Sequence, residues 1–252
     1  MKGNSMNETI QQLYERKSTR AFLKEPIAQK EKEIIFEAAM QAPSAGNMSL
    51  YSIVEISDPV LKEKLAILCD DQPFIVQAPL VLLFLADYQK WHTLFASHDL
   101  PFAGFGEGDL FLAMADCLIA AQNTVVAAES LGIGSCYIGD IIEHYEEVKE
   151  LLHLPKYALP AAMLVYGKPA PSALARCKPP RFSIQDMVFT NSYPERSDKQ
   201  IEEMFMRRQD LAKGELDSYV KRIHSFKYNT DFRQEMNRSV QVMIDSWSRH
   251  DV

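Results

Sequence analysis

The sequence predicts an α+β or α/β protein built around one mixed sheet. Segments with helical spacing alternate along the 252 residues with short runs of β-forming residues. The run Leu80–Ala86 is apolar at every position, which is typical of a central strand covered on both faces. Residues 109–131 form one long alanine-rich segment that is apolar nearly all round and is followed by Gly132. We expect this helix to be buried, in part against a second subunit.

The N-terminal part is predicted to hold two helices and a tight loop. Apolar residues at helical spacing follow Thr9, which has the spacing of a capping box with Gln12. A second apolar stripe includes Ile35 and should end before Pro43, because the residue before a proline resists helical geometry. Residues 44–47 then predict a tight loop.

The remaining elements follow from the same patterns. Residues 87–108 hold aromatic side chains without a clean period, which favours a mobile lid or an interface excursion. From about residue 195 the chain becomes charged and polar, and we expect helices there that dock on the body or on a partner. The chain is therefore predicted to be one domain, 1–252, with 194–252 as a helical extension. Strands are predicted at 51–56, 135–138 and 161–167, and short helices around Leu65 and Val148.

Charge and cysteine content narrow the class of function. The 27 Lys and Arg residues against 34 Asp and Glu give a net charge of -7, which disfavours broad attraction to nucleic acid or anionic lipid. Four widely spaced cysteines suit free thiols in a reducing cytosol. The polar start lacks the apolar core of a signal peptide, and Leu80–Ala86 is too short to span a bilayer. We expect a cytoplasmic protein with no nucleic-acid or membrane partner.

No motif for a side-chain nucleophile or a metal centre is present. The sequence lacks G-x-S-x-G, a P-loop, H-E-x-x-H and zinc-ligand spacing, and its six histidines are scattered. The glycines of 104–108 lack the preceding strand and the spacing that a dinucleotide fingerprint requires. The sequence predicts no metal and no catalytic side chain, and it favours a bound cofactor that carries the chemistry.

The segment 16–20, Arg-Lys-Ser-Thr-Arg, has the composition of a phosphate site. It places three cations and two hydroxyls at a predicted helix end, where charge-assisted hydrogen bonds to phosphate can form. A solvated basic helix terminus is the alternative. Lys178 and Arg181 form a second cationic pair that could close over a phosphate, and a plain surface loop explains them nearly as well. Residues 42–47, Ala-Pro-Ser-Ala-Gly-Asn, offer a hydroxyl, an amide and a glycine, although a simple turn would contain the same residues.

Taken in order from about Asn7 to Tyr193, these segments resemble the flavin-dependent nitroreductase family, in particular its oxygen-insensitive, NADPH-preferring flavin reductase branch. No single motif is decisive, and the order and spacing over most of the chain carry the resemblance. The segments are 16–22, 42–47, 71–74 (Asp-Gln-Pro-Phe), 121–123, 128–132, 137–139, Leu159-Pro160, Lys178 with Arg181, and 191–193.

The resemblance implies an α+β homodimer with a central mixed, mainly antiparallel sheet flanked by helices, and FMN at the subunit interface. Arg16, Lys17 and Arg20, with Lys178 and Arg181, are expected at the phosphate and ribityl groups. Ser18, Ser44 and Gln72 are expected at the ribityl chain or the ring edge. The neighbouring loop residues Gly46 and Asn47, and the strand end at Tyr137, Ile138, Gly139 and Asp140, complete the expected cofactor site.

The activity implied is hydride transfer from NADPH or NADH to FMN, followed by transfer of two electrons to a nitroaromatic, a quinone or free flavin in a ping-pong cycle. Arg207 or Arg208 is the candidate for gripping the NADPH 2′-phosphate. Two alternatives stay open. Relatives of this kind dehalogenate, dehydrogenate or break down flavin, and a non-enzymatic flavin-binding protein is the other possibility.

Three positions depart from the branch pattern. Arg16 stands where histidine is frequent, and Pro180 adds a residue between Lys178 and Arg181. Asp140 follows Gly139 where a second glycine is usual. A carboxylate there could exclude some acceptors or disfavour anionic reduced flavin.

Overall fold

A computed structural model describes residues 7–100, 104–212 and 214–248, and these form two compact units. The first unit contains the described residues up to 176 and from 235 onward, and the second contains 177–234. The expectation of one domain with an extension over 194–252 stays a prediction. The bounds of the second unit differ from those of the expected extension, because residues 235–248 return to the first unit.

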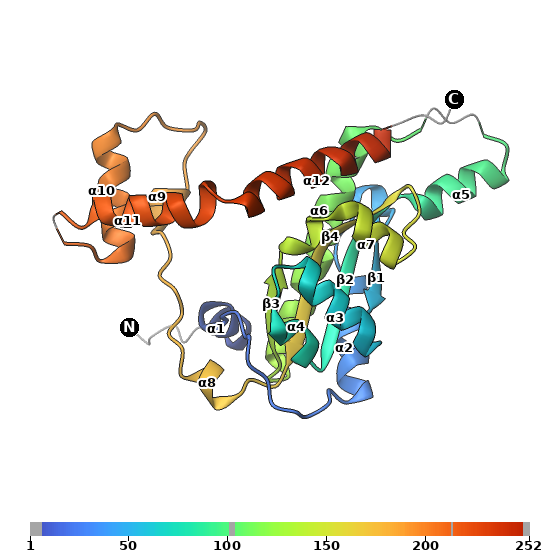
Figure 1. Ribbon diagram of the computed structural model, residues 1–252, viewed down its shortest axis with the longest axis horizontal. Helices are drawn as coiled ribbons and strands as arrows, with labels where there is room; N and C mark the ends of the chain where they lie inside the picture. The colour runs from blue at the N-terminus through green and yellow to red at the C-terminus, as the bar shows by residue number, and fades with distance from the viewer. Residues whose placement is uncertain (1–6, 101–103, 213, 249–252) are drawn as a thin grey trace. The chain divides into compact units, whose positions relative to one another are not determined.

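The first unit is built on a four-stranded sheet in the order β1-β2-β4-β3, in which all three strand pairs are antiparallel (Figure 1). In the register, Val54 faces Leu83 and Leu83 faces Met163. An isolated parallel bridge between Ser18 and Ser135 makes the sheet mixed. The predicted α+β class with a mainly antiparallel sheet is confirmed. The strands are β1 (Tyr51–Glu55), β2 (Leu80–Asp87), β3 (Gly134–Ile138) and β4 (Ala158–Gly167).

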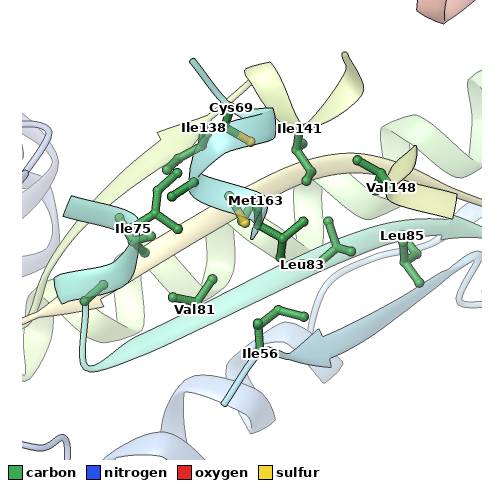
Figure 2. Close-up of a cluster of buried hydrophobic side chains, with 14 of the residues drawn as sticks. Ile56, Cys69, Ile75, Val81, Leu83, Leu85, Ile138, Ile141, Val148 and Met163 are labelled. Carbon is green, nitrogen blue, oxygen red and sulfur yellow. The ribbon is translucent and has the colours of Figure 1, made fainter. Parts of the chain in front are cut away.

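Strand β2 is buried along its whole length, as its unbroken apolar run predicts. Alternate side chains enter two different core clusters because successive residues of a strand point to opposite faces. Val81 and Leu83 lie in one cluster with Ile75 (Figure 2). Leu82 and Phe84 lie in the other.

Helices cover both faces of this sheet (Figure 1). Helices α2 (Gln29–Met40) and α6 (Glu107–Ser130) pack on the face of Leu82. Helices α3 (Pro59–Leu68), α4 (Pro73–Gln77) and α7 (Tyr145–Leu151) contribute to the cluster on the face of Val81. Gly132 has φ +70°, a left-handed conformation that favours glycine, and it ends α6 as predicted.

Helix α6 is the one helix among the described residues that has the length and apolar composition to cross a bilayer. Core helices of soluble proteins also have these properties, and 44% of its most apolar stretch is buried in this unit. Helix α6 is therefore a longer apolar segment than Leu80–Ala86, the stretch from which the sequence predicts no membrane span. The expectation that the protein has no membrane partner stays a prediction.

Two local predictions are wrong. Helix α1 (Glu8–Glu15) is capped by Asn7, whose side chain accepts a hydrogen bond from the Ile10 N–H at 3.0 Å, so Thr9 and Gln12 form no capping box. Residues 89–97 of the expected irregular excursion form helix α5 (Gln89–Ser97). An aromatic stripe stabilises α5, since Trp91 packs on Phe95 and donates from Nε1 to the Met48 carbonyl at 3.0 Å. The expectation of a lid also covered residues 101–103, which lie outside the described residues.

Helix α12 (Asp231–Ser248) returns the chain to the first unit. Trp247 is fully buried and donates from Nε1 to the Gly106 carbonyl at 3.0 Å. Its ring packs edge-on against Tyr88 and Tyr157 in a third core cluster. The prediction of C-terminal helices that dock on the body is confirmed for this helix. The other short helices of the first unit are η1 (Ala45–Asn47), η2 (Asp140–Ile142) and α8 (Pro171–Leu174).

The second unit is helical. Ser197 caps α10 by accepting a hydrogen bond from the Gln200 N–H, and the Gln200 side chain accepts from the Ser197 N–H in return. Its elements are α9 (Ile184–Met187), α10 (Asp198–Gln209), α11 (Leu216–Ile223) and a π-helical turn, His224–Tyr228.

Candidate cofactor site

The basic segment 16–20 leaves the end of α1 and runs along β3. Arg16 is the C-cap of α1, and the Thr19 N–H donates to the Ser135 carbonyl at 2.9 Å. The two backbones can approach because residue 134 is glycine: a Cβ at Gly134 would lie 2.8 Å from the Thr19 Cβ. This bridge holds Ser18 beside Ser135.

Arg16 carries the least satisfied polar group of the segment. Its Nε and Nη2 atoms are buried and have no hydrogen-bond partner. The Ser135 hydroxyl, fully buried on the neighbouring strand, also has none. Buried donors without acceptors are costly, and the large majority in native proteins are satisfied. Ser135 was not predicted from the sequence, since a lone serine in a strand carries no signal there.

The pKa of the Cys136 thiol, on β3, is affected by the cationic side chains of the basic segment. Burial raises the pKa of its thiol, while the charges of Arg20 and Arg16 and a hydrogen bond from Ser18 oppose that shift. Burial likewise raises the pKa of Tyr137 to about 12, with Arg16 again opposing. The structure therefore brings together three of the predicted residues, Arg16, Ser18 and Arg20, around the start of β3.

Lys17 points elsewhere. Its Nζ donates to the carbonyls of Leu174 and Arg176, at 2.7 and 2.5 Å, just beyond helix α8. In this arrangement its ammonium ties the segment to the chain after β4. Arg20 also has a second contact, since its guanidinium lies 5.9 Å from the centre of the Phe74 ring.

The loop 44–47 is held by a residue that the sequence did not indicate. Asp116, buried on α6, accepts hydrogen bonds from the Ala45 N–H at 2.9 Å and the Leu50 N–H at 3.2 Å. Gly46 and Asn47 both have positive φ, +56° and +57°, which suits glycine and asparagine. The fixed loop places the hydroxyl of Ser44 and the amide of Asn47 at the end of α2.

Gln72 and Asp140, which the sequence predicts separately as site residues, form a hydrogen-bonded pair. The Gln72 Nε2 donates to the Asp140 carboxylate and, at 2.8 Å, to the Cys69 carbonyl. Both amide protons are thereby used, which leaves the Gln72 Oε1 oxygen as the group that can accept from a ligand. Asp140 begins η2 directly after β3, so Tyr137, Ile138 and Gly139 lead into this pair. A Cβ at Gly139 would meet no atom within 4 Å, which shows open space beside the backbone.

Four predicted residues belong to the second unit. The Arg181 side chain donates to the Pro179 carbonyl at 3.1 Å, and Lys178 precedes it on the same stretch. Arg207 pairs with Asp186 at 2.9 Å. The Arg208 guanidinium lies 4.3 Å from the centre of the Phe182 ring.

The basic cluster fits a phosphate- and hydroxyl-bearing cofactor. A phosphate or a ribityl hydroxyl supplies the acceptors that the Arg16 nitrogens lack, and the open backbone at Gly139 leaves room for a flat ring. A carboxylate-rich metal centre would need different donors from these. Among the described residues, the acidic side chains that come together, Asp70, Asp140 and Glu143, lie beside Gln72 and not at the cations.

Comparison with known proteins shows which family the chain belongs to. The model of the nitroreductase family matches residues 13–168. The chain is 35% identical over 181 residues to "FMN reductase [NAD(P)H]" of Bacillus subtilis, covering 71% of this chain and 73% of the relative. It is 34% identical over 210 residues to "Oxygen-insensitive NADPH nitroreductase" of Salmonella typhimurium, covering 81% and 85%. The solved structure of the NfrA1 nitroreductase from B. subtilis superposes with a TM-score of 0.75 at 26% identity, covering 92% of this chain and 98% of that one. The matched family, the curated relatives and the fold together show that this chain belongs to the nitroreductase family.

Proposed function

We propose that the protein is an FMN-dependent NAD(P)H oxidoreductase that passes two electrons to a nitroaromatic, a quinone or free flavin. Its membership of the nitroreductase family and the FMN reductase and nitroreductase names of its relatives support this proposal. The observation that carries it is the Arg16 guanidinium, whose buried nitrogens lack an acceptor beside the Ser18–Ser135 bridge.

In this proposal each group of residues contacts a different part of FMN. Arg16, Ser18 and Arg20 hold the phosphate and the nearby ribityl hydroxyls. Lys17 joins them by exchanging its carbonyl acceptors for the ligand. Gln72 presents its Oε1 to a donor on the cofactor, because Asp140 and Cys69 occupy both of its amide protons. The remaining expected contacts are Ser44, Gly46 and Asn47 of the loop, Tyr137, Ile138, Gly139 and Asp140 of the strand end, and Lys178 and Arg181 of the second unit.

FMN held by these residues would supply the two-electron redox chemistry, with hydride from a nicotinamide as the source of the electrons and a ping-pong cycle as the kinetic scheme. The chain's own residues bind, orient and exclude water. Positive charge from Arg16 and Arg20 favours an anionic ligand, and the open backbone at Gly139 admits a flat donor or acceptor. No side-chain acid or base is required.

We also propose Arg208 for the nucleotide 2′-phosphate. Arg207 is neutralised by Asp186, whose pKa is lowered by hydrogen bonds from Ser183 and Arg207. Arg208 lies on the Phe182 ring and donates to the Pro180 carbonyl at 3.5 Å. Among the described residues of the second unit, its charge has no carboxylate partner. A stacked guanidinium with free donors suits phosphate recognition.

A homodimer is part of the proposal. Helix α6 leaves large apolar side chains exposed along one side, with Phe111 at 73% and Leu118 at 45%. Leu112 and Ile119 are also exposed, and apolar side chains that recur in this way along one side of a helix mark an interface. A second copy of the chain is the partner that the family suggests, and it would cover this face.

The cysteines support a cytosolic setting. All four are free thiols, and Cys177 is exposed, as a reducing compartment allows. Small-molecule acceptors are the proposed partners, and nucleic acid is not among them because the net charge is -7.

The test is an absorption spectrum of the purified protein before and after NADPH. We expect a yellow protein, or one that takes up added FMN, whose flavin absorbance bleaches with NADPH and returns when a quinone is added. A protein that binds no FMN would refute the proposal. Bound FMN that NAD(P)H does not bleach would instead favour a different reaction on the same fold.

A further inference from the structure

Three acidic side chains converge on one point at the edge of the first unit. Asp70 follows helix α3, Asp140 begins η2, and Glu143 follows η2. One carboxylate oxygen from each lies within 4.8 Å of the other two. Figure 2 shows the chain neighbours Cys69 and Ile141 in the same core region, which explains why these two loops meet.

The burial of Glu143 is a second, independent observation that indicates a ligand at these three acidic side chains. It is only 2% exposed, and its Oε1 atom is buried without any hydrogen-bond partner. An ionised carboxylate is expensive to bury, so buried charges in proteins are paired or coordinate metals. Among the described residues, no cation forms an ion pair with Glu143 that could offset the unpaired Oε1.

The charges around Glu143 add to the need for a positive partner. The charge of Glu235, on α12, also disfavours a negative charge on Glu143, and Glu235 is itself held by Arg238 at 2.7 Å. If one of these carboxyl groups were protonated instead, its proton could form a hydrogen bond to only one of the other carboxylates. A cation placed between Asp70, Asp140 and Glu143 would contact one oxygen of each and would supply the partner that the Glu143 Oε1 lacks.

We propose that Asp70, Asp140 and Glu143 form a binding site for a divalent cation of the hard, oxygen-preferring class of Mg²⁺, Mn²⁺ and Ca²⁺. Carboxylate oxygens are the donors that these ions prefer. Asp70 is exposed and Asp140 is half-buried, so water can reach the ion from that side and complete its coordination. The inference does not depend on the proposed redox function.

Mn²⁺ is the probe for the test, because the paramagnetic resonance signal of the free ion disappears on binding. The full-length protein as purified is treated with EDTA, dialysed and titrated with Mn²⁺. We expect one tight site per chain, and an increase in Tm with Mn²⁺. Glu143→Gln should weaken binding roughly tenfold or more, since even residues behind a metal ligand commonly cost that much.

The matched control is Glu150→Gln, which removes the same charge from an exposed position of α7 outside the group. It should leave the Mn²⁺ affinity unchanged. Asp70→Asn, at an exposed position, provides a second ligand variant if Glu143→Gln does not fold. The proposal is overturned if the protein binds no Mn²⁺ at millimolar concentration, or if both ligand variants bind it as tightly as the natural sequence. An infrared band of a protonated Glu143 at neutral pH in the presence of Mn²⁺, lost in Glu143→Gln, would also overturn it.

Discussion

Arg16 has two buried guanidinium nitrogens without a hydrogen-bond partner, and a bound anion would supply the missing acceptors. In the FMN-free protein, Arg16→Met should leave the free energy of unfolding unchanged or raised, because it removes buried charge that has no partner. FMN affinity should fall by about 10- to 100-fold, the loss of a charge-assisted hydrogen bond worth about 1.5–3 kcal/mol. Fluorescence titration with FMN and urea unfolding measure the two effects.

Arg176→Met is the control for charge, since Arg176 is exposed and only its backbone carbonyl contacts Lys17. It should bind FMN as tightly as the natural sequence. An Arg16→Met variant with unchanged FMN affinity would contradict the place proposed for Arg16.

Asp140 sets both the orientation of Gln72 and the local charge. In Asp140→Asn we expect a more positive flavin midpoint potential, because a negative charge near the ring disfavours anionic reduced flavin. A shift of about 30 mV corresponds to a tenfold change in the two-electron equilibrium. Redox titration in EDTA measures the shift without any bound cation. Glu63→Gln, at an exposed position of α3, should leave the potential unchanged. No shift in Asp140→Asn would place the carboxylate away from the ring.

At the scale of elements, α6 organises the site by holding the 44–50 segment through Asp116. Asp116→Ala leaves the buried N–H of Leu50 and the partly buried N–H of Ala45 without their acceptor, and we expect the free energy of unfolding to fall by about 2–3 kcal/mol. FMN affinity should fall with it, because the loop that carries Ser44 and Asn47 loses its anchor. Urea unfolding and FMN titration test both.

Asp109→Ala separates the two effects. Asp109 also lies on α6 and accepts from a backbone N–H, that of Gly106 at 2.9 Å, but it does not touch the loop. It should lower stability without changing FMN affinity. If the two variants affect FMN equally, Asp116 has no specific role in the site.

Helix α12 is attached to α7 through Arg238, which bonds Glu146 at 2.7 and 2.9 Å and also contacts Glu235. Hydrogen bonds from Arg238 lower the pKa of both carboxyls. Their stabilisation is therefore complete above the ordinary carboxyl pKa and is lost as pH falls through the lowered values. Arg238→Met should be less stable than the natural sequence at neutral pH, by a modest amount because the pair is partly exposed.

This difference in stability should shrink on acidification, which urea unfolding at neutral and acid pH can measure. Arg233→Met provides the comparison, since Arg233 lies over Tyr228 and has no carboxylate partner among its described contacts. Its effect should not depend on pH. A gap between Arg238→Met and the natural sequence that widens in acid would exclude this account.

At the scale of the whole molecule, the exposed side of α6 is the interface that we propose for the dimer. Phe111→Asp with Leu118→Asp should convert a dimer into a monomer, because a charge in an apolar interface costs several kcal/mol unless it is paired. Light scattering measures the mass, and FMN retention on a desalting column shows whether the site needs the partner. Ile67→Asp, on the exposed side of α3 at 64% exposure, should leave the mass unchanged. A double variant that stays dimeric would move the interface elsewhere.

Much of the fold follows from local pattern. The apolar run of β2, the alanine-rich α6 and the stop at Gly132 are each properties of a few consecutive residues, and the structure has them where the sequence predicts. Helix α5 could not be found this way, since its stripe is aromatic and is stabilised by a contact between Trp91 and the distant Met48. The N-cap at Asn7 was not predicted, because Thr9 and Gln12 have the three-residue spacing of a capping box and lie only a few residues further along the chain.

The candidate cofactor site also has features that the local sequence predicts and features that depend on distant contacts. The sequence by itself determined the family and the residue types expected of a phosphate site, because Arg16, Ser18 and Arg20 are close together in the chain and the other motifs keep a fixed order. Only the tertiary structure decided which of these groups lack partners, that Lys17 turns to α8, and that Ser135 and Asp116 lie beside the predicted residues. The convergence of Asp70 with Asp140 and Glu143 is of the same kind. Hydrogen bonding and burial depend on which segments meet in space, and residues that lie about 70 positions apart show no local pattern that reveals their contact.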